Sequence, residues 1–388
     1  MSGEGHWLAL GLMSGTSLDG IDAALLDTDG EAEVRPGAFL TVPYEPAFRE
    51  RLRDCLGGRG DIAVVEADIT HLHATAVNAL LERTGLDAGA VDVVGFPGHT
   101  IAHRPAESLT WQIGDGALLA GLVGIDVVSD FRSRDVAAGG QGAPLAPLYH
   151  AALAADLARP LAVLNVGGVA NLTWLDSGHP PVAFDTGPGG ALLDDWARRH
   201  TGRDFDADGA LARAGTVDGG TVARLLEHPY FDRPPPKSLD RDAFAGAAEG
   251  LSAADGAATL TAFTAAAVGR AEEHLAAPPK RWLVTGGGRR NPVLMDCLAA
   301  TLAAPVAAVE SVGWDGDALE AQAFAYLAVR SRRGDALTMP STTGAPRPLG
   351  GGVLHRAETR DETGDETRGA SVRRRPTGGA TGSPRRGR

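Results

Sequence analysis

Residues 7–26 read WLALGLMSGTSLDGIDAALL, and this stretch decides the fold. The apolar runs at 7–12 and 21–26 predict two consecutive strands. The loop between them, at 13–17, consists of small and hydroxyl-bearing residues, so its backbone N–H groups can face an anion without steric cost. The pattern predicts a phosphate-binding hairpin. It is not a P-loop, because no Gly-Lys-Ser/Thr follows. It is not a dinucleotide fingerprint, because a strand follows the loop where that motif needs a helix.

Two further glycine-rich segments follow predicted strands, DTGPG at 185–189 and GGG at 286–288. One glycine turn is usually only a turn. Three of them, spread over both halves of an α/β chain, favour a nucleotide bound between two lobes. The expected ATP- and phosphate-binding residues are Ser14, Gly15, Thr16, Ser17, Asp19, Gly20, Asp22, Thr186, Gly187, Gly189, Gly286, Gly287 and Gly288.

The remaining pattern predicts two α/β lobes. In the first half we expect helices around 45–56 and 61–84, strands at 91–96 and 108–113, and a helix capped by Asp115. The second half has expected strands at 161–166, 169–175, 182–184 and 282–285. A helix is expected to begin at Asn291-Pro292, and a last one to span 315–333. One lobe would comprise 1–132 with 315–355, and the other 133–314. The residues alone do not reveal whether the halves are duplicates.

Composition limits the function classes. The net charge of -13 argues against a nucleic-acid-binding protein, and no apolar run is long enough to cross a membrane. The start of the chain lacks the basic region of a signal peptide, so a cytoplasmic location is expected. Cys55 and Cys297 have no nearby partner, which disfavours a disulfide scaffold or a zinc site. Residues 356–388, rich in Gly, Thr and Arg, predict a disordered tail.

The three glycine segments resemble the two phosphate loops and the adenosine-side turn of the actin/hexokinase-like superfamily. Over 10–350 the chain is similar to the anhydro-N-acetylmuramic acid kinase family, and DFRSRDVAAGGQGAPL at 130–145 is the most specific of the matching motifs. The other matching motifs are GLMSGTSLDGIDAALLD, HTIAHRP, WQIGDGALLA, LNVGGVANLTWL, FDTGPGGALLDDW, PPPKSLDR, TGGGRRNPVLM and EAQAFAYLA. The resemblance implies an α/β, two-lobed actin/hexokinase-like (ribonuclease H-like) fold with an active-site cleft between the lobes.

The resemblance also implies an activity. Family members open the 1,6-anhydro bond of their sugar with water and phosphorylate the freed O6, using ATP and Mg²⁺. The product is N-acetylmuramic acid 6-phosphate, formed in peptidoglycan recycling. The implied partner is a small sugar, with no nucleic acid or membrane, and the implied assembly is a homodimer.

The family resemblance implies catalytic roles for two acidic residues, Asp185 and Glu320. Asp185 matches the general base, and we expect it to be ionised at neutral pH without a large pKa shift. Glu320 matches the acid that serves the magnesium–water shell, so Asp19 and Glu320 are the metal candidates. Arg132 could pair with the lactyl carboxylate of the sugar. Outside these motifs, Asp185 would be a turn residue and Arg132 part of a solvated turn.

The other expected sugar-binding residues are His99, Gln141 and Asn165, and here the chain departs from the family. Gly-Phe-Pro-Gly-His-Thr stands at 95–100 in place of Gly-Ser-His-Gly-Gln-Thr, so His99 could restore a lost donor. Pro-Lys-Ser-Leu-Asp-Arg at 236–241 replaces Pro-Lys-Ser-Thr-Gly-Arg, and Gly190 replaces an Asn. Met13 occupies the place of the usual superfamily aspartate, which leaves Asp19, Asp22, Asp185 and Glu320 as candidate acids.

Three alternatives stay open. The altered segment at 96–99 would suit a kinase for a related anhydro or amino sugar. A catalytically silent nucleotide- or sugar-binding regulator of the same fold would keep the lobes without turnover, although Asp185 and Glu320 disfavour it. A chaperone-type ATPase is the weakest alternative, because no peptide-binding domain follows the lobes.

Overall fold

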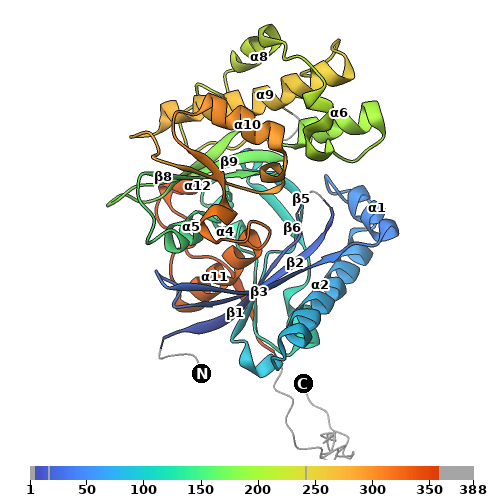
Figure 1. Cartoon of the computed structure of the whole chain (residues 1–388). Coiled ribbons are helices and arrows are strands. Elements are labelled where there is room, and N and C mark those ends of the chain that lie inside the picture. Colours follow the sequence, from blue (N-terminus) through green and yellow to red (C-terminus); the bar gives the residue numbers. More distant parts are fainter. Residues whose placement is uncertain (1–4, 16–17, 241–242, 358–388) are drawn as a thin grey trace, which may run out of the picture. The chain divides into compact units, whose positions relative to one another are not determined.

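The computed structural model describes residues 5–15, 18–240 and 243–357, which belong to one compact unit (Figure 1). The predicted tail lies outside the described residues from 358 onward. Its first two residues are described, and both bond to Asp126: Arg356 Nη1 lies 3.2 Å from Oδ2, and Ala357 N donates to Oδ1. No described helix is long and apolar enough to cross a membrane, and the thiols of Cys55 and Cys297 are free.

The first sheet has the strand order β13-β7-β4-β1-β2-β3. Strands β1, β2 and β3 form an antiparallel meander, whereas β4 and β7 run parallel to β1. Parallel neighbours need crossover connections, and α2 and α3 lie in the segments that join them. The strands are β1 (Trp7–Met13), β2 (Gly20–Thr28), β3 (Val34–Pro43), β4 (Val93–Phe96), β7 (Val127–Ser129) and β13 (Val353–His355).

The second sheet repeats this topology. Its order is β10-β9-β8-β11-β12, again an antiparallel meander of three strands followed by two strands parallel to the first. The halves are therefore structural duplicates, and the chain has the predicted two-lobed actin/hexokinase-like fold. The strands are β8 (Leu161–Val166), β9 (Val169–Leu175), β10 (Val182–Pro188), β11 (Trp282–Thr285) and β12 (Val306–Ala308); β5 (His99–Arg104) and β6 (Leu109–Ile113) form a separate hairpin.

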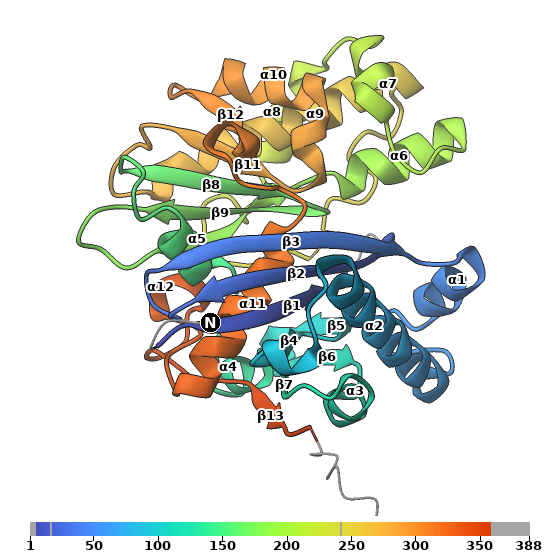
Figure 2. The same cartoon turned by 60° about the horizontal axis from the view of Figure 1, so that its bottom comes forward.

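Helices cover both faces of the first sheet (Figure 2). Side chains alternate along β1, so Leu10 and Leu12 join the cluster under α2, whereas Ala9 joins the cluster around α11. The helices are α1 (Pro46–Asp54), α2 (Ile62–Thr84), α3 (Gly116–Val123), α4 (Ser133–Ala137), α5 (Pro147–Leu153), α6 (Ala191–Thr201), α7 (Ala210–Arg213), α8 (Gly219–Leu226), α9 (Ala253–Ala271), α10 (Pro292–Thr301), α11 (Leu319–Arg333) and α12 (Pro340–Thr343).

Two glycines let α11 pack directly on the sheet. A Cβ added at Gly11 of β1 would collide with the carbonyl oxygen of Ala321, and one at Gly95 of β4 with that of Phe324. Only glycine permits backbones to approach so closely. The contact holds the first turn of α11 beside the end of β1, where the first glycine loop begins.

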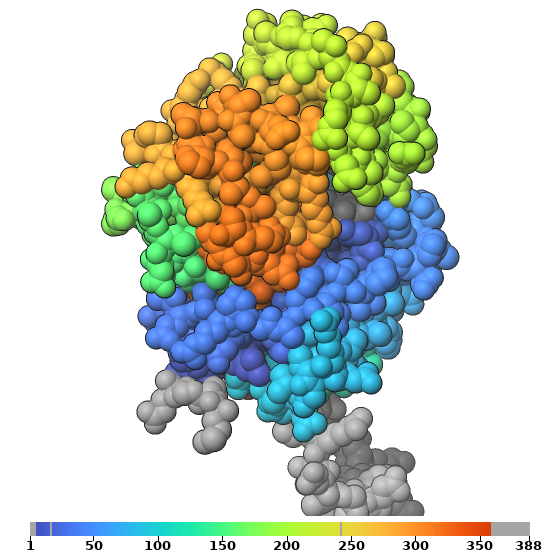
Figure 3. Space-filling view, in the orientation of Figure 1, coloured from blue at the N-terminus to red at the C-terminus, as the bar shows by residue number. Residues whose placement is uncertain are grey.

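One hydrophobic cluster contains residues of both sheets. It joins Ala9 and Val93 of the first sheet to Val163 and Leu283 of the second, through residues of α5 and α11. Side chains of the second half, coloured green and orange, lie against the blue N-terminal strands over a broad boundary (Figure 3).

Two element predictions were wrong. Residues 34–43 form β3, which the sequence reading missed because Pro36 and Gly37 interrupt its alternation. Residues 185–188 are not a turn after a strand. They continue β10, and a bulge between Asp185 and Gly187 takes up the irregular register.

Candidate active site

Two ring-bearing side chains, Tyr44 and His99, hold Ser14 of the first glycine loop in place. Ser14 Oγ lies 2.5 Å from the hydroxyl of Tyr44 and 2.7 Å from Nδ1 of His99. All three side chains are buried, and burial raises the pKa of the Tyr44 hydroxyl and lowers that of His99 to about 4. Ser14 is therefore held by uncharged groups. Thr16 and Ser17, predicted phosphate donors, lie outside the described residues.

His99, predicted to bind the sugar, lies next to Ser14 of the first glycine loop. Its ring has no exposed surface, and Nε2 is buried without a hydrogen-bond partner among the described residues. His99 is therefore anchored through Nδ1, which shares a hydrogen bond with Ser14 Oγ.

Carboxylates gather where β2 begins and α11 begins. Asp22 pairs in register with Met13 of β1, and burial raises its pKa to about 6, although Thr41 donates a hydrogen bond to it. Asp19, Glu320 and Asp317 raise that pKa further by charge repulsion. Asp317 is itself paired with Arg289 at 3.0 Å.

Glu320 lies in the first turn of α11 and joins this helix to β8 of the second sheet. Its Oε1 accepts a hydrogen bond of 3.3 Å from Asn165 Nδ2 at the end of β8. The side chain reaches solvent, yet surrounding protein atoms desolvate the carboxylate and raise its pKa, which Arg132 and Asn165 partly offset. The predicted sugar ligands Arg132 and Asn165 thus both lie at Glu320.

A row of polar residues crosses the second sheet. Asn165 of β8 is opposite Asn171 of β9, and Asn171 is opposite Asp185 of β10; Thr285 of β11 pairs with Asn165 on the other side. Directly paired residues project from the same face of a sheet. Adjacent strands lie about 4.8 Å apart, so Asp185 and Asn165 are about 10 Å apart. Asn171 of β9 is the middle member of this row.

Asp185 is held by the segment that carries Lys237. Its backbone N–H donates to Lys237 O at 3.0 Å, its Oδ2 accepts from Leu239 N at 2.8 Å, and its carbonyl accepts from the Tyr230 hydroxyl. Burial raises the pKa of Asp185 to about 7, and the Leu239 N–H lowers it only in part. This shift differs from the expectation of an ordinary carboxylate. A base of this pKa is suited to proton transfer near neutral pH.

Lys237 itself is a structural residue. Its ammonium group is buried and donates to the carbonyls of Tyr230 and Phe231, next to Nε2 of His274. Burial lowers its pKa to about 8. The lysine therefore fixes the course of the chain that positions Asp185.

Gln141 contacts the segment at 237–239 that holds Asp185. Its Oε1 accepts a hydrogen bond of 2.6 Å from Ser238 Oγ, next to Leu239. Its backbone N–H donates to Thr343 O, and buried Asp135 accepts from Gly142 N and Thr343 Oγ1. Asp135 thus holds the conformation of the loop at 139–142. Arg132 also bonds to this loop, because its Nη1 donates to Gly142 O at 2.7 Å.

The glycine segments at 185–189 and 286–288 differ in how accessible their hydrogen-bond donors are to a ligand. Thr186 is buried and its hydroxyl donates to Ala170 O, so it is not a free phosphate donor. At the third segment, Gly286 has φ 75°, and a Cβ there would collide with Asn165 Oδ1. Nothing lies near the position of a Cβ on Gly287, which leaves its backbone open. The third segment therefore adjoins the Asn165–Glu320 pair.

Comparison with known proteins identifies the family. The sequence profile of the family described as anhydro-N-acetylmuramic acid kinase matches residues 7–357. A protein named anhydro-N-acetylmuramic acid kinase from Paramagnetospirillum magneticum is 62% identical over 352 residues, covering 90% of this chain and 99% of that protein. The protein of that name from Rhodospirillum rubrum is 58% identical, and the match covers 92% of this chain and 96% of that protein. The one from Rhizorhabdus wittichii is 55% identical, and the match covers 90% of this chain and 99% of that protein. This chain belongs to the anhydro-N-acetylmuramic acid kinase family.

Proposed function

We propose that this protein is an ATP-dependent kinase that opens 1,6-anhydro-N-acetylmuramic acid with water and phosphorylates O6. The product would be N-acetylmuramic acid 6-phosphate, an intermediate of peptidoglycan recycling. The observation that carries the proposal is the polar row of Asn165, Asn171 and Asp185, with a base of pKa about 7 at one end and Glu320 bonded at the other.

The chemistry assigns one role to each end of the row. Asp185 takes a proton from water, whose oxygen bonds to the anomeric carbon while the bond from that carbon to O6 breaks. The electron pair left on O6 forms the bond to the γ-phosphorus, and the bond from that phosphorus to the bridging oxygen of ADP breaks. Asp185 later returns its proton to solvent. Arg132 and Gln141 would orient the sugar, and the N–H groups of the first and third glycine segments would hold phosphates.

Magnesium fits the acids at the other end. Mg²⁺ usually keeps several waters and binds through one or two carboxylates. Asp19, Asp22 and Glu320 supply oxygen donors whose mutual repulsion a cation would relieve. Among the described residues, no three metal-ligating side chains lie close enough together to hold an ion by themselves. The ion would neutralise phosphate charge.

A direct assay tests the function. Purified protein, ATP, Mg²⁺ and 1,6-anhydro-N-acetylmuramic acid should give ADP and a 6-phosphosugar in equal amounts, measured by chromatography and ³¹P NMR. ADP without phosphosugar, or no reaction, would refute the proposal.

A second candidate is a kinase for a related anhydro or amino sugar. Phe96, Pro97 and Gly98, where the chain departs from the family, line a cavity of about 280 Å³ with Trp111 and Asp130. A panel of 1,6-anhydro sugars tests it: a higher kcat/KM for a sugar other than the muramic acid derivative would favour this candidate.

We also propose that the protein acts in the cytoplasm as a homodimer, on the family resemblance. Light scattering on the full chain should give twice the monomer mass of 39.9 kDa. A monomer mass at assay concentrations would contradict the dimer.

A further inference from the structure

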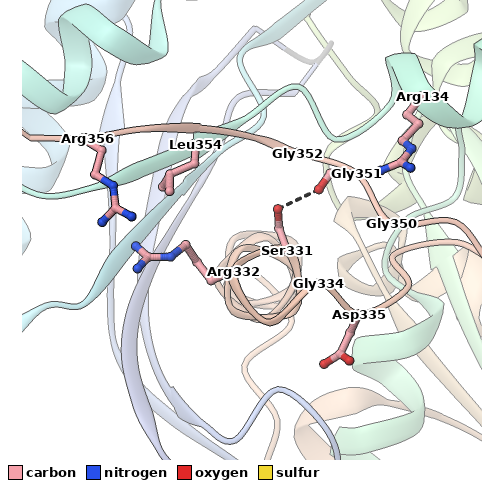
Figure 4. Close-up of a pocket in the computed structure, with 10 residues that line it drawn as sticks. All are labelled: Arg134, Ser331, Arg332, Gly334, Asp335, Gly350, Gly351, Gly352, Leu354 and Arg356. Atoms are coloured by element: carbon pink, nitrogen blue, oxygen red, sulfur yellow. Dashed lines mark hydrogen bonds between the residues drawn. The ribbon is translucent and has the colours of Figure 1, made fainter.

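A cavity of about 390 Å³ lies at the C-terminal end of α11, away from the polar row (Figure 4). Ser331 and Arg332 of α11 line it, eleven or more residues beyond Glu320. At 1.5 Å per residue this is about 17 Å along the helix, so ATP bound at Glu320 does not fill it. The other lining residues used below are Arg134, Asp335, Gly350, Gly351, Gly352, Leu354 and Arg356.

The cavity is basic in a chain whose net charge is -13. Arg332 and Arg356 share one carboxylate oxygen of Asp126, at 2.8 and 3.2 Å, so one positive charge of that pair stays uncompensated. Asp335, the one acid of the lining, is paired with Arg333 at 2.7 Å. The lining therefore attracts anions.

Arg134 supplies a second uncompensated charge from the opposite wall, as Figure 4 shows. Its side chain is exposed and makes no hydrogen bond or ion pair with another described residue. Arg134 follows Arg132 by two residues but lines this cavity, whereas Arg132 lies at Glu320. The guanidinium group of Arg134 can donate a pair of hydrogen bonds to a phosphate.

Between Arg134 and Arg356 the cavity is lined by the backbone of the glycines at 350–352. Ser331 Oγ donates to Gly351 O at 2.6 Å and fixes the strand-like segment of three glycines. Gly352 has φ 83°, and a Cβ there would collide with Ser331 Oγ. The N–H groups of Gly350, Gly351 and Gly352 donate to no other residue that the structure describes. A free backbone N–H that faces the cavity can donate to an anion.

We propose that this cavity binds a small phosphorylated metabolite, with the phosphate at Arg134 beside Gly350 and with Arg356 adding positive charge at the other end. The volume is within the range of small-molecule sites and exceeds that of a bare ion. Leu354, 37% exposed, offers an apolar surface for the carbon skeleton. A phosphate monoester on a skeleton of hexose size meets these features. The inference does not depend on the proposed reaction.

Isothermal titration calorimetry with glucose 6-phosphate as the probe tests the site. A non-hydrolysable ATP analogue at saturation keeps the nucleotide site filled, and glucose serves as the uncharged comparison. The full-length protein should bind glucose 6-phosphate and not glucose, and inorganic phosphate more weakly than the ester. Binding should weaken as salt rises, because the contacts are charged.

Two single variants locate the site. Arg134→Gln should weaken binding at least about tenfold, the order expected for a lost charge-assisted hydrogen bond. Arg356→Gln should weaken it about threefold through the lost positive charge. The matched control is Arg213→Gln, another exposed arginine without a described ion pair, on α7; it should bind like the wild type. Both test side chains are exposed, and thermal melts confirm that the variants fold. Absence of binding in the wild type, unchanged binding in Arg134→Gln and Arg356→Gln, or an equal loss in Arg213→Gln would each overturn the proposal.

Discussion

At the scale of single residues, the account depends on Asp185 and its raised pKa. A carboxylate with a pKa of about 7 is largely protonated at pH 6, and only its ionised form can accept a proton from water. We expect log kcat/KM for the anhydro sugar to rise with pH at unit slope below about 7 and then to level off. Steady-state kinetics from pH 5 to 9 measures this. A profile that is flat down to pH 5 would contradict the shift.

The same shift predicts a stability difference. The folded-state pKa of Asp185 lies above its ordinary value of 3.8, so the carboxyl group stabilises the fold below that value and loses its contribution as pH rises through 7. Asp185→Asn removes the ionisation and keeps an oxygen acceptor for Leu239 N–H. We expect the Tm of this variant, relative to wild type, to be higher at pH 8 than at pH 5. Equal differences at both pH values would count against burial as the cause.

The Ser14 contacts yield a further residue-scale prediction. Tyr44→Phe removes the 2.5 Å contact and should cost about 1 kcal/mol of unfolding free energy, with a severalfold rise in KM for ATP. Tyr326→Phe is the control, since it removes a 2.7 Å bond to Glu31 O far along α11. Denaturant unfolding and ATP kinetics compare the two. If both variants alter KM equally, Tyr44 does not position the loop.

Part of the site could be predicted from residue patterns. Asp185 and Glu320 stand in recognisable motifs, and the structure places them at the two ends of the candidate site. Tyr44, Asn171 and the burial of His99 could not be anticipated, because they depend on contacts between distant strands. The raised pKa of Asp185 likewise arises from tertiary burial, which no local pattern reports.

At the scale of elements, the contact of α11 with β1 positions Glu320. Gly11→Ala would drive a methyl group into the Ala321 carbonyl, so we expect a loss of about 3 kcal/mol or more and a large loss of turnover. Gly121→Ala is the matched control: it lies in α3, is exposed, and its added Cβ meets nothing. It should stabilise the fold by about 0.5–1 kcal/mol without changing turnover. Urea unfolding and kinetics measure both; a harmless Gly11→Ala would contradict the packing.

Local chemistry predicted some elements well. Asp115 accepts from Ala117 N and Leu118 N at the start of α3, and Asn291 caps α10 ahead of Pro292, both as predicted. The failures have a tertiary cause. β3 is held by pairing with β2 despite Pro36, and β10 continues past Asp185 because pairing with β9 extends the strand.

At the scale of the whole molecule, two sheets of the same topology share one hydrophobic cluster around α5 and α11. Elements that share a core unfold together. We expect residues 5–357 to give a single calorimetric transition, with equal calorimetric and van't Hoff enthalpies. Two separated transitions would show that the lobes are independent.

The most direct test of the central claim is the ATP affinity and turnover of Asp185→Asn, measured on one preparation. If Asp185 is the base that activates water, the variant should bind the non-hydrolysable ATP analogue with wild-type affinity while turnover falls at least about a hundredfold. Lost nucleotide binding would assign Asp185 to the fold or to the metal. Retained turnover would contradict its role as the base.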